Sequence, residues 1–137
     1  MQVSKYVALG ILPLLAACGG TAQISDINEQ RVFFDFDKSD IRKDAKEGLL
    51  AQSEYLKQNP DVKIQVAGNC DERGSVEYNL ALGARRANAS KQVLVKDGVD
   101  AKRIKTVSYG KERPWKQGTG ESVWKWNRNT TTTATNK

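Results

Sequence analysis

The sequence predicts an α/β (α+β) two-layer sandwich, in which helices pack on a single sheet. Two observations predict it: short segments whose apolar residues alternate, and longer segments whose apolar residues recur at helical spacing. In chain order these segments are strand, helix, strand, helix and strand, an alternation typical of helices packed on a sheet. The 137 residues suit one domain with a single core.

Three segments are expected to form strands. RVFFDF at residues 31–36 and DVKIQVAG at residues 61–68 have the alternating pattern of half-buried strands, and a third strand is expected near residues 103–108, closed by Gly110 and Pro114. Because successive side chains of a strand point to opposite faces, one face of each is expected to be buried. We therefore expect three strands in this order.

The first expected helix occupies the segment between the first two strands. Ser39 or Asp40 can cap its N-terminus, and Asn59 followed by Pro60 stops it. A mostly apolar face, expected to pack on the sheet, comprises Ile41, Ala45, Leu49, Gln52 and Leu56.

The second expected helix begins at Ser75 or Val76 and continues to Lys96. Gly98 follows as its terminator. On one side this helix is expected to carry Tyr78, Leu82, Ala89 and Val93.

The C-terminal segment has a weaker pattern. We expect a fourth, weak strand at about residues 127–134, since threonine favours strands, but a frayed tail remains open because the run lacks apolar alternation. Burying a threonine hydroxyl without a partner costs roughly 1 to 3 kcal/mol. Residues after Arg128 are therefore expected to contribute little to the core.

The N-terminal residues have the build of a secretory signal rather than of the fold. Residues 1–17 contain an early cation, an apolar run and small residues, and the ending LAAC resembles a bacterial lipobox. This predicts a lipoprotein signal peptide at 1–17, lipidation at Cys18 and a flexible tether at 18–30. By resemblance to the enteric sorting rule, in which an aspartate after the cysteine retains lipoproteins at the inner membrane, Gly19 implies the outer membrane, with the domain facing the periplasm. If Cys18 is acylated, Cys70 has no partner for an intrachain disulfide.

The charge leaves a polyanionic partner open but does not favour it. The net charge is +6, yet 22 basic residues are mixed with 16 acidic ones without a long block of one sign. Trp115, Trp124 and Trp126 could stack on bases, but secretion argues against nucleic acid. We expect any nucleic-acid contact to be weak and sensitive to salt.

The composition also argues against catalysis, a metal or a cofactor. The chain has no histidine, so the usual general base and the commonest metal ligand are missing. Cys70 has no histidine to activate it, and Asp71 and Glu72 are neighbours whose side chains are expected to point apart. Gly68 and Gly74 bracket the turn without the spacing of a phosphate-binding loop. We do not expect an enzyme.

Three motifs resemble the C-terminal domain family of outer-membrane protein A. They are FDFDKSDI at 34–41, GNCDERGSVEYNLALGARRA at 68–87 and VSYGKERP at 107–114, and the resemblance covers residues 31–114. It implies a βαβαβ domain with an optional last strand, two main helices on one mixed sheet, at residues 31–137. It further implies a periplasmic domain that binds the peptide stem of peptidoglycan without breaking it and that partners TolB in the Tol system of envelope integrity and cell division.

The resemblance also implies site residues. The family's acidic ligand matches Asp71 and its helix arginine matches Arg86; they would take the ammonium and the carboxylate of a diaminopimelate side chain. Other matched positions are Asn79, Leu82, and the loop residues Phe36, Asp37, Lys38 and Ser39.

Other roles stay open for these matched residues. Asp71 could cap a turn, Asn79 could brace the loop, Leu82 could belong to the core and Arg86 could be a surface cation. A second possibility for the whole protein is a scaffold that contacts Tol proteins and has lost wall binding.

This chain departs from the family pattern at two places. Asn69 and Cys70 stand before the aspartate, where histidine or tyrosine and then threonine or alanine are common. After Arg128 the chain continues with Asn129 and threonines, instead of arginine and an apolar strand. The second departure is the one that places the last strand in doubt.

Overall fold

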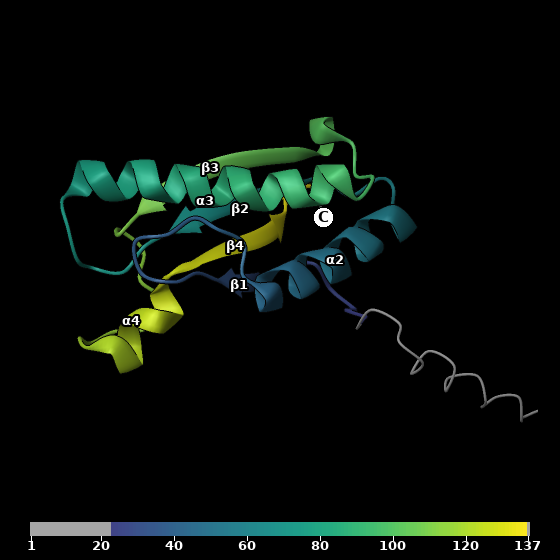
Figure 1. Ribbon diagram of the computed structural model, residues 1–137. Helices are drawn as coiled ribbons and strands as arrows, with labels where there is room; N and C mark the ends of the chain where they lie inside the picture. The colour runs from purple at the N-terminus through teal and green to yellow at the C-terminus, as the bar shows by residue number, and fades with distance from the viewer. Residues whose placement is uncertain (1–22, 137) are drawn as a thin grey trace, which may run out of the picture.

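A mixed four-stranded sheet forms one layer, and the two long helices α2 and α3 lie against it as the second (Figure 1). This is a computed structural model, and it describes residues 23–136, so the expected signal peptide and Cys18 lie outside the described residues. The elements are β1 (Gln30–Phe33), α2 (Lys43–Gln58), β2 (Ile64–Asn69), α3 (Val76–Lys96), a 3-10 turn (Ala101–Arg103), β3 (Ile104–Gly110), α4 (Glu121–Asn127) and β4 (Asn129–Ala134). The predicted two-layer fold is confirmed.

The strand order in the sheet is β1-β4-β2-β3. The last strand, β4, runs antiparallel to both of its neighbours, whereas β2 and β3 are parallel. The fourth strand expected at about residues 127–134 is therefore confirmed as β4, whereas the alternative of a frayed tail was wrong and the strand is central, not weak. Because β4 lies between β1 and β2, truncation after Arg128 would divide the sheet instead of trimming its edge.

The threonines of β4 are buried because their hydroxyls find partners. Thr132 is fully buried and its Oγ1 donates to Gln52 Oε1 on α2 at 2.6 Å. Thr130 is buried as well, and its hydroxyl lies 2.9 Å from that of Ser90 on α3. The expected penalty for unpartnered hydroxyls does not arise, so residues after Arg128 contribute to the core.

Helix α3 has the predicted ends. Ser75 is the N-cap, its hydroxyl accepting from the Tyr78 N–H at 3.0 Å, and Gly98 follows the helix with a φ of 109°. The predicted packed side was partly wrong, since Tyr78 is 45% exposed and Ala89 and Val93 are only partly buried. The buried residues of this helix are Asn79, Leu82, Gly83, Arg86, Ala87, Ser90 and Leu94.

Two glycines explain why α3 presents this more polar side to the sheet. A Cβ added to Gly68 on β2 would lie 1.8 Å from the carbonyl oxygen of Gly83, and one added to Gly83 would lie 2.9 Å from that of Gly68. Only glycine allows the strand and the helix to approach this closely. The end of β2 is thus drawn against the middle of α3.

Helix α2 begins later than predicted, at Lys43 instead of after Ser39 or Asp40, and β1 ends earlier, at Phe33. The intervening loop turns sharply, since Lys38 N–H donates to the Asp35 carbonyl at 3.2 Å and Asp37 has a φ of 60°. The predicted apolar face is largely confirmed: Ala45, Leu49, Gln52 and Leu56 are buried, and Ile41 packs against the core from outside the helix.

Part of the expected tether belongs to the domain. Ile27 is fully buried in the core, and Ile24 packs against it. Asn28 Oδ1 accepts from the Ala134 N–H at 2.8 Å, which fixes this segment to the end of β4. The tether predicted for residues 18–30 therefore does not extend to Gln30, because apolar side chains of its second half are buried.

Helix α4 was not predicted, since seven residues are too few to show a helical period. Its Trp126 contacts Phe33 edge to face, with ring centres 5.6 Å apart, and Trp115 completes this aromatic cluster.

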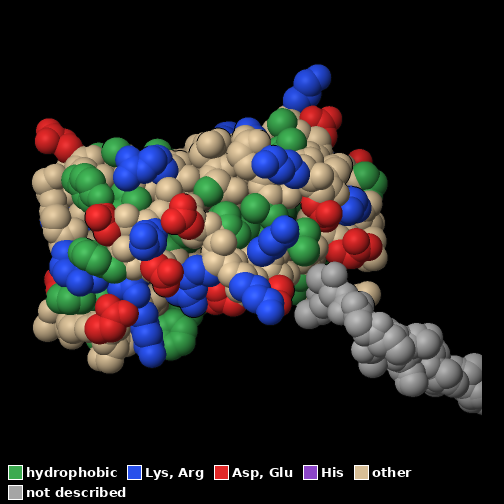
Figure 2. Space-filling model, in the orientation of Figure 1, with side chains coloured by type: hydrophobic (Ala, Val, Ile, Leu, Met, Phe, Trp, Pro, Cys, Tyr) green, Lys and Arg blue, Asp and Glu red, His purple; other side chains and the backbone are tan. Residues whose placement is uncertain are grey.

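Lys, Arg, Asp and Glu side chains are interspersed over the helix-bearing face (Figure 2). Within residues 23–136, no helix is long and apolar enough to cross a membrane.

Candidate functional site

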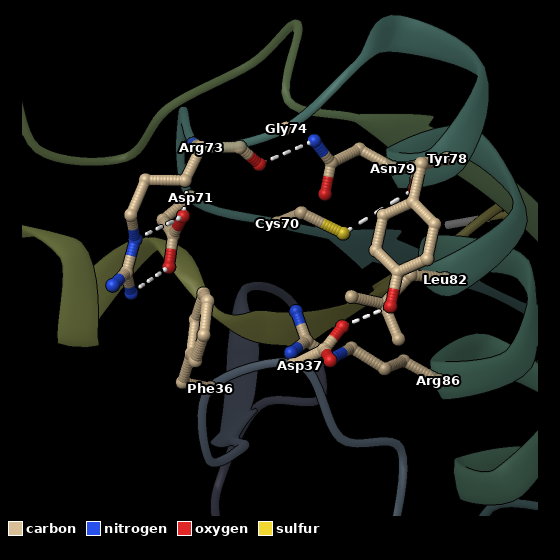
Figure 3. A pocket seen from close by; sticks show the side chains of 10 residues that line it. All are labelled: Phe36, Asp37, Cys70, Asp71, Arg73, Gly74, Tyr78, Asn79, Leu82 and Arg86. Atoms are coloured by element: carbon tan, nitrogen blue, oxygen red, sulfur yellow. Dashed lines mark hydrogen bonds and ion pairs between the residues drawn. The ribbon is translucent and has the colours of Figure 1, made fainter.

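A pocket of about 380 Å³ opens between the loop after β1, the turn after β2 and the first half of α3 (Figure 3). The close approach of Gly68 to Gly83 folds this turn back beside the helix. The helix position of Arg86 and the turn position of Asp71 therefore come to the same pocket, although they are 15 residues apart in the sequence.

Most of the predicted site residues line this pocket. They are Phe36, Asp37, Asp71, Asn79, Leu82 and Arg86. Lys38 and Ser39 do not line it; Lys38 contributes its backbone carbonyl to Arg86 instead. Four lining residues were not predicted as site residues: Cys70, Arg73, Gly74 and Tyr78.

Arg86 is fully buried and holds three backbone carbonyls. Its Nε donates to the Lys38 carbonyl at 2.8 Å, Nη1 to that of Asn69 at 2.9 Å, and Nη2 to that of Asp35 at 3.0 Å. A guanidinium has five N–H donors, so two of them are not held by these carbonyls. Burial lowers the pKa of Arg86 from its ordinary value. The alternative that Arg86 is a surface cation is therefore wrong. Its three hydrogen bonds join the loop after β1 to the end of β2.

Asp71 is also buried, and both of its carboxylate oxygens are occupied. Oδ1 accepts from the backbone N–H and Nε of Arg73 at 3.0 and 3.1 Å; Oδ2 accepts from Arg73 Nη2 at 2.7 Å and Arg128 Nη1 at 3.4 Å. Burial acts to raise the pKa of Asp71, but the hydrogen bonds from Arg73 and Arg128 outweigh it and hold the pKa below its usual range. Asp71 is therefore an anion that two arginines neutralise.

Arg73 is held between two aromatic rings. Its guanidinium carbon lies 3.8 Å from the ring centre of Phe36 and 4.0 Å from that of Trp124. Such stacking leaves the edge of the guanidinium free to bind carboxylates. The sequence offers one local signal for this residue, an arginine two positions after the aspartate, but its aromatic neighbours lie 37 positions before it and 51 after it.

A second carboxylate completes an ion network beside the pocket. Glu121 of α4 binds Arg128 with both oxygens, at 3.0 and 2.8 Å, and lies 3.8 Å from Arg73 Nη2. These two acids and two arginines balance in charge, and Arg128 also donates to the Phe34 carbonyl at 2.8 Å. From the sequence, Arg128 was only the last residue before the chain departs from the family pattern, and no role in the pocket was predicted for it.

The turn after β2 is braced from inside. Asn79 is buried, and its Nδ2 donates to the carbonyls of Arg73 at 2.7 Å and Ser75 at 3.1 Å, so it is a brace as well as a lining residue. Gly74 has a φ of 99°, which other residues rarely adopt. The Cys70 thiol donates to the Asn79 carbonyl at 3.3 Å.

Tyr78 and Asp37 meet across the mouth of the pocket. The Tyr78 hydroxyl donates to Asp37 Oδ1, and Figure 3 shows this contact joining α3 to the loop after β1. The hydrogen bond to the Asp37 carboxylate raises the pKa of Tyr78, because it favours the protonated phenol.

Cys70 at the pocket and Glu72 beside it have structural surroundings that fix their state. Burial raises the pKa of Cys70, so its sulfur is a thiol and not the nucleophilic thiolate. Glu72 turns away from Asp71 and accepts from Thr119 and Trp124 at 2.8 Å, so the two acids do not form a pair. Among residues 23–136, no three His, Cys, Asp or Glu side chains are placed to hold a metal ion.

Known proteins resemble this chain in sequence and in fold. The profile of the OmpA family matches residues 33–128. A peptidoglycan-associated lipoprotein of Mesorhizobium japonicum is 48% identical over 126 residues, which cover 91% of this chain and 75% of that protein. Another peptidoglycan-associated lipoprotein, from Haemophilus influenzae, is 40% identical, and the match covers 92% of this chain and 94% of that protein.

Two solved structures resemble this chain in fold. The peptidoglycan-associated lipoprotein from Burkholderia pseudomallei matches with a TM-score of 0.75 at 38% identity, covering 78% of this chain and 91% of that chain. The C-terminal domain of Helicobacter pylori MotB matches with a TM-score of 0.72 at 19% identity, covering 78% of this chain and 84% of that chain, and shares the fold alone. The resemblance read from the three motifs is confirmed: the chain belongs to the OmpA family and is a homologue of the peptidoglycan-associated lipoproteins.

Proposed function

We propose that this protein is an outer-membrane lipoprotein whose periplasmic domain binds the peptide stem of peptidoglycan without breaking it, and so ties the outer membrane to the wall. The names of its relatives support association with peptidoglycan. The observation that carries the proposal is the lining of the pocket, where two carboxylates, Asp37 and Asp71, stand with two guanidinium groups, Arg73 and Arg86. Such a lining suits a zwitterion.

The free end of a diaminopimelate side chain is such a zwitterion. Its carboxylate would bind the two N–H groups of Arg86 that no carbonyl occupies, because a guanidinium fork fits two oxygens. Its ammonium would bind Asp71. Since the oxygens of Asp71 already accept four bonds, the ammonium must displace a donor, and the half-buried Arg73 is the one at the mouth.

Calorimetric titration tests this arrangement. A diaminopimelate-containing stem peptide is titrated into the full mature chain in detergent micelles, beside Asp71→Asn and Arg86→Lys. Loss of one charge-assisted bond costs roughly 1.5 to 3 kcal/mol, so we expect each variant to bind about tenfold more weakly or worse. Arg86→Lys keeps the buried charge, and its melting temperature shows whether the three carbonyls remain held.

Two controls make the titration specific. Glu77→Gln and Lys91→Gln remove one charge of each sign from α3 outside the pocket, and they should bind as the parent does. A lysine-containing stem lacks the terminal carboxylate and should bind poorly. If the lysine stem binds equally well, or if both pocket variants match the parent, Asp71 and Arg86 do not bind the zwitterion.

The proposal includes a place in the Tol system with TolB as partner, which rests on the family resemblance. A pull-down from cells separates wall binding from this partnership. Recovery of both peptidoglycan and TolB supports the full proposal. Recovery of TolB without peptidoglycan would identify the scaffold that has lost its wall ligand.

A further inference from the structure

The helix-free face of the sheet carries a second pocket. Because strand side chains alternate between faces, Val32 of β1 enters the core while Arg31 points to the other side. This pocket, which we call the helix-free pocket, has a volume of about 330 Å³ and is lined by side chains of all four strands and of the loop after β3. It shares no lining residue with the pocket of Asp71 and Arg86.

Two arginines of the helix-free pocket are held on aromatic rings. The guanidinium carbon of Arg31 lies 4.1 Å from the ring centre of Trp115, and that of Arg113 lies 3.7 Å from the ring centre of Tyr109. Each ring covers one face of a guanidinium and leaves its N–H edge available to carboxylates. Among the described residues, no Asp or Glu lines this pocket.

One exposed acid lies close to this pair. Glu29 Oε1 is 3.8 Å from Arg31 Nη1, and its side chain is 73% exposed. An ion pair so long and so open to water contributes little. Arg31 is therefore not neutralised by a buried partner, and a carboxylate brought in by a ligand can replace this contact.

Two buried polar atoms of the helix-free pocket lack a partner. Arg31 Nε is a donor and Asn69 Oδ1 is an acceptor, and neither has a hydrogen bond. Asn69 is 7% exposed, and its Nδ2 donates to Asn129 Oδ1 at 2.9 Å. This hydrogen bond fixes the orientation of the side-chain amide, and Oδ1 of the same amide has no donor. Buried polar groups are normally satisfied, so an unpaired donor and acceptor in one pocket point to a ligand that supplies both counterparts.

We propose that the helix-free pocket binds an extended acidic segment of a partner protein. Carboxylates of that segment bind the edges of Arg31 and Arg113, and a backbone N–H binds Asn69 Oδ1. The polar groups favour a peptide over a phosphate or a nucleic-acid backbone, which offers acceptors to the arginines but no N–H to the asparagine. The inference does not depend on the wall ligand, because the two pockets are separate.

Nuclear magnetic resonance of the ¹⁵N-labelled full chain in zwitterionic micelles tests it. The probe is an acetylated and amidated hexapeptide that alternates glutamate with threonine, and its glutamine counterpart is the control. We expect the glutamate peptide to shift the side-chain signals of Asn69, Arg113 and Trp115, and the glutamine peptide to leave them unchanged. Arg31→Gln with Arg113→Gln should weaken the glutamate peptide roughly tenfold or more.

A matched variant removes the effect of net charge. Lys43→Gln with Lys102→Gln loses the same two charges from exposed positions outside the helix-free pocket and should bind as the parent does. Equal binding of the glutamine peptide, or equal weakening by the two double variants, would overturn the proposal. So would shifts confined to Asp71 and its neighbours, or shifts at Trp115 that anionic phospholipid vesicles produce and the peptide does not.

Discussion

At the scale of single residues, the pocket of Asp71 and Arg86 depends on charged groups that already have hydrogen-bond partners within the protein. Arg86 is fully buried, and its guanidinium donates to three backbone carbonyls, two in the loop after β1 and one at the end of β2. Such an arginine positions the pocket walls even when no ligand is bound. Asp71 in turn orders the turn after β2 through both the backbone and the side chain of Arg73. Both residues therefore combine a structural task with the binding task proposed for them.

The lowered pKa of Asp71 predicts how stability depends on pH. Because the folded pKa lies below the unfolded value of about 3.9, Asp71 stabilises the fold above that value, and the contribution is lost as pH falls through the folded pKa. We expect Asp71→Asn to be less stable than the parent at pH 7, with a gap that narrows below about pH 4. Urea unfolding from pH 7 to pH 2 measures it. A gap that stays constant would contradict the prediction.

At the scale of elements, β4 shows how a polar strand can occupy the centre of a sheet. Its buried threonines meet Gln52 of α2 and Ser90 of α3, so each helix supplies one polar partner to the same strand. Arg128 directly precedes the strand and connects the sheet to Asp71 and Glu121. β4 thus joins the core to the ligand pocket.

Paired threonine variants test this role of β4. Thr132→Val removes the hydroxyl that satisfies the buried Gln52, and leaving such a group unpaired costs about 1 to 3 kcal/mol. Thr133→Val changes the next, partly exposed position on the other face of the strand and should alter the free energy of unfolding by less than about 0.5 kcal/mol. Guanidinium unfolding compares them. Equal losses in both variants would show that the Gln52 contact contributes nothing specific.

At the scale of the whole molecule, the number of residues between Cys18 and the core limits how far the domain could extend from an acylated Cys18. Ile27 is the first fully buried residue of the described chain, nine positions after Cys18. A fully extended chain spans at most about 3.6 Å per residue, so this linker reaches roughly 30 Å. Acylation of Cys18 would therefore hold the pocket near the membrane surface, and the wall would have to lie within that reach plus the domain's own length.

Lipid anchoring is tested in cells. Each buried acyl CH₂ contributes about 0.8 kcal/mol, so a cysteine that carries several chains keeps a protein on the bilayer. We expect the parent to incorporate labelled palmitate and to sediment with the outer membrane, and Cys18→Ala to do neither. A Cys18→Ala protein that still sediments with the outer membrane, without label, would show that anchoring has another source.

Much of this protein follows from local sequence. The ends of α3 are set by a serine cap and a terminating glycine, and β2 follows from apolar alternation, because these signals arise within a few residues of where they act. The lipobox and the three family motifs are local in the same sense. The apolar patterns predicted the fold class, and the three motifs predicted the family and six residues of the pocket.

Only the tertiary structure decided the features that depend on distant partners. The central position of β4 required Gln52, 80 positions away from Thr132, and Ser90, 40 positions away from Thr130. The packed side of α3 follows from Gly83 meeting Gly68, and no helical period reveals such a contact. Arg73 joined the pocket through aromatic rings from the loop after β1 and from α4. A sequence pattern records which residues prefer burial, whereas the partner that permits burial of a hydroxyl or a charge is chosen by the fold.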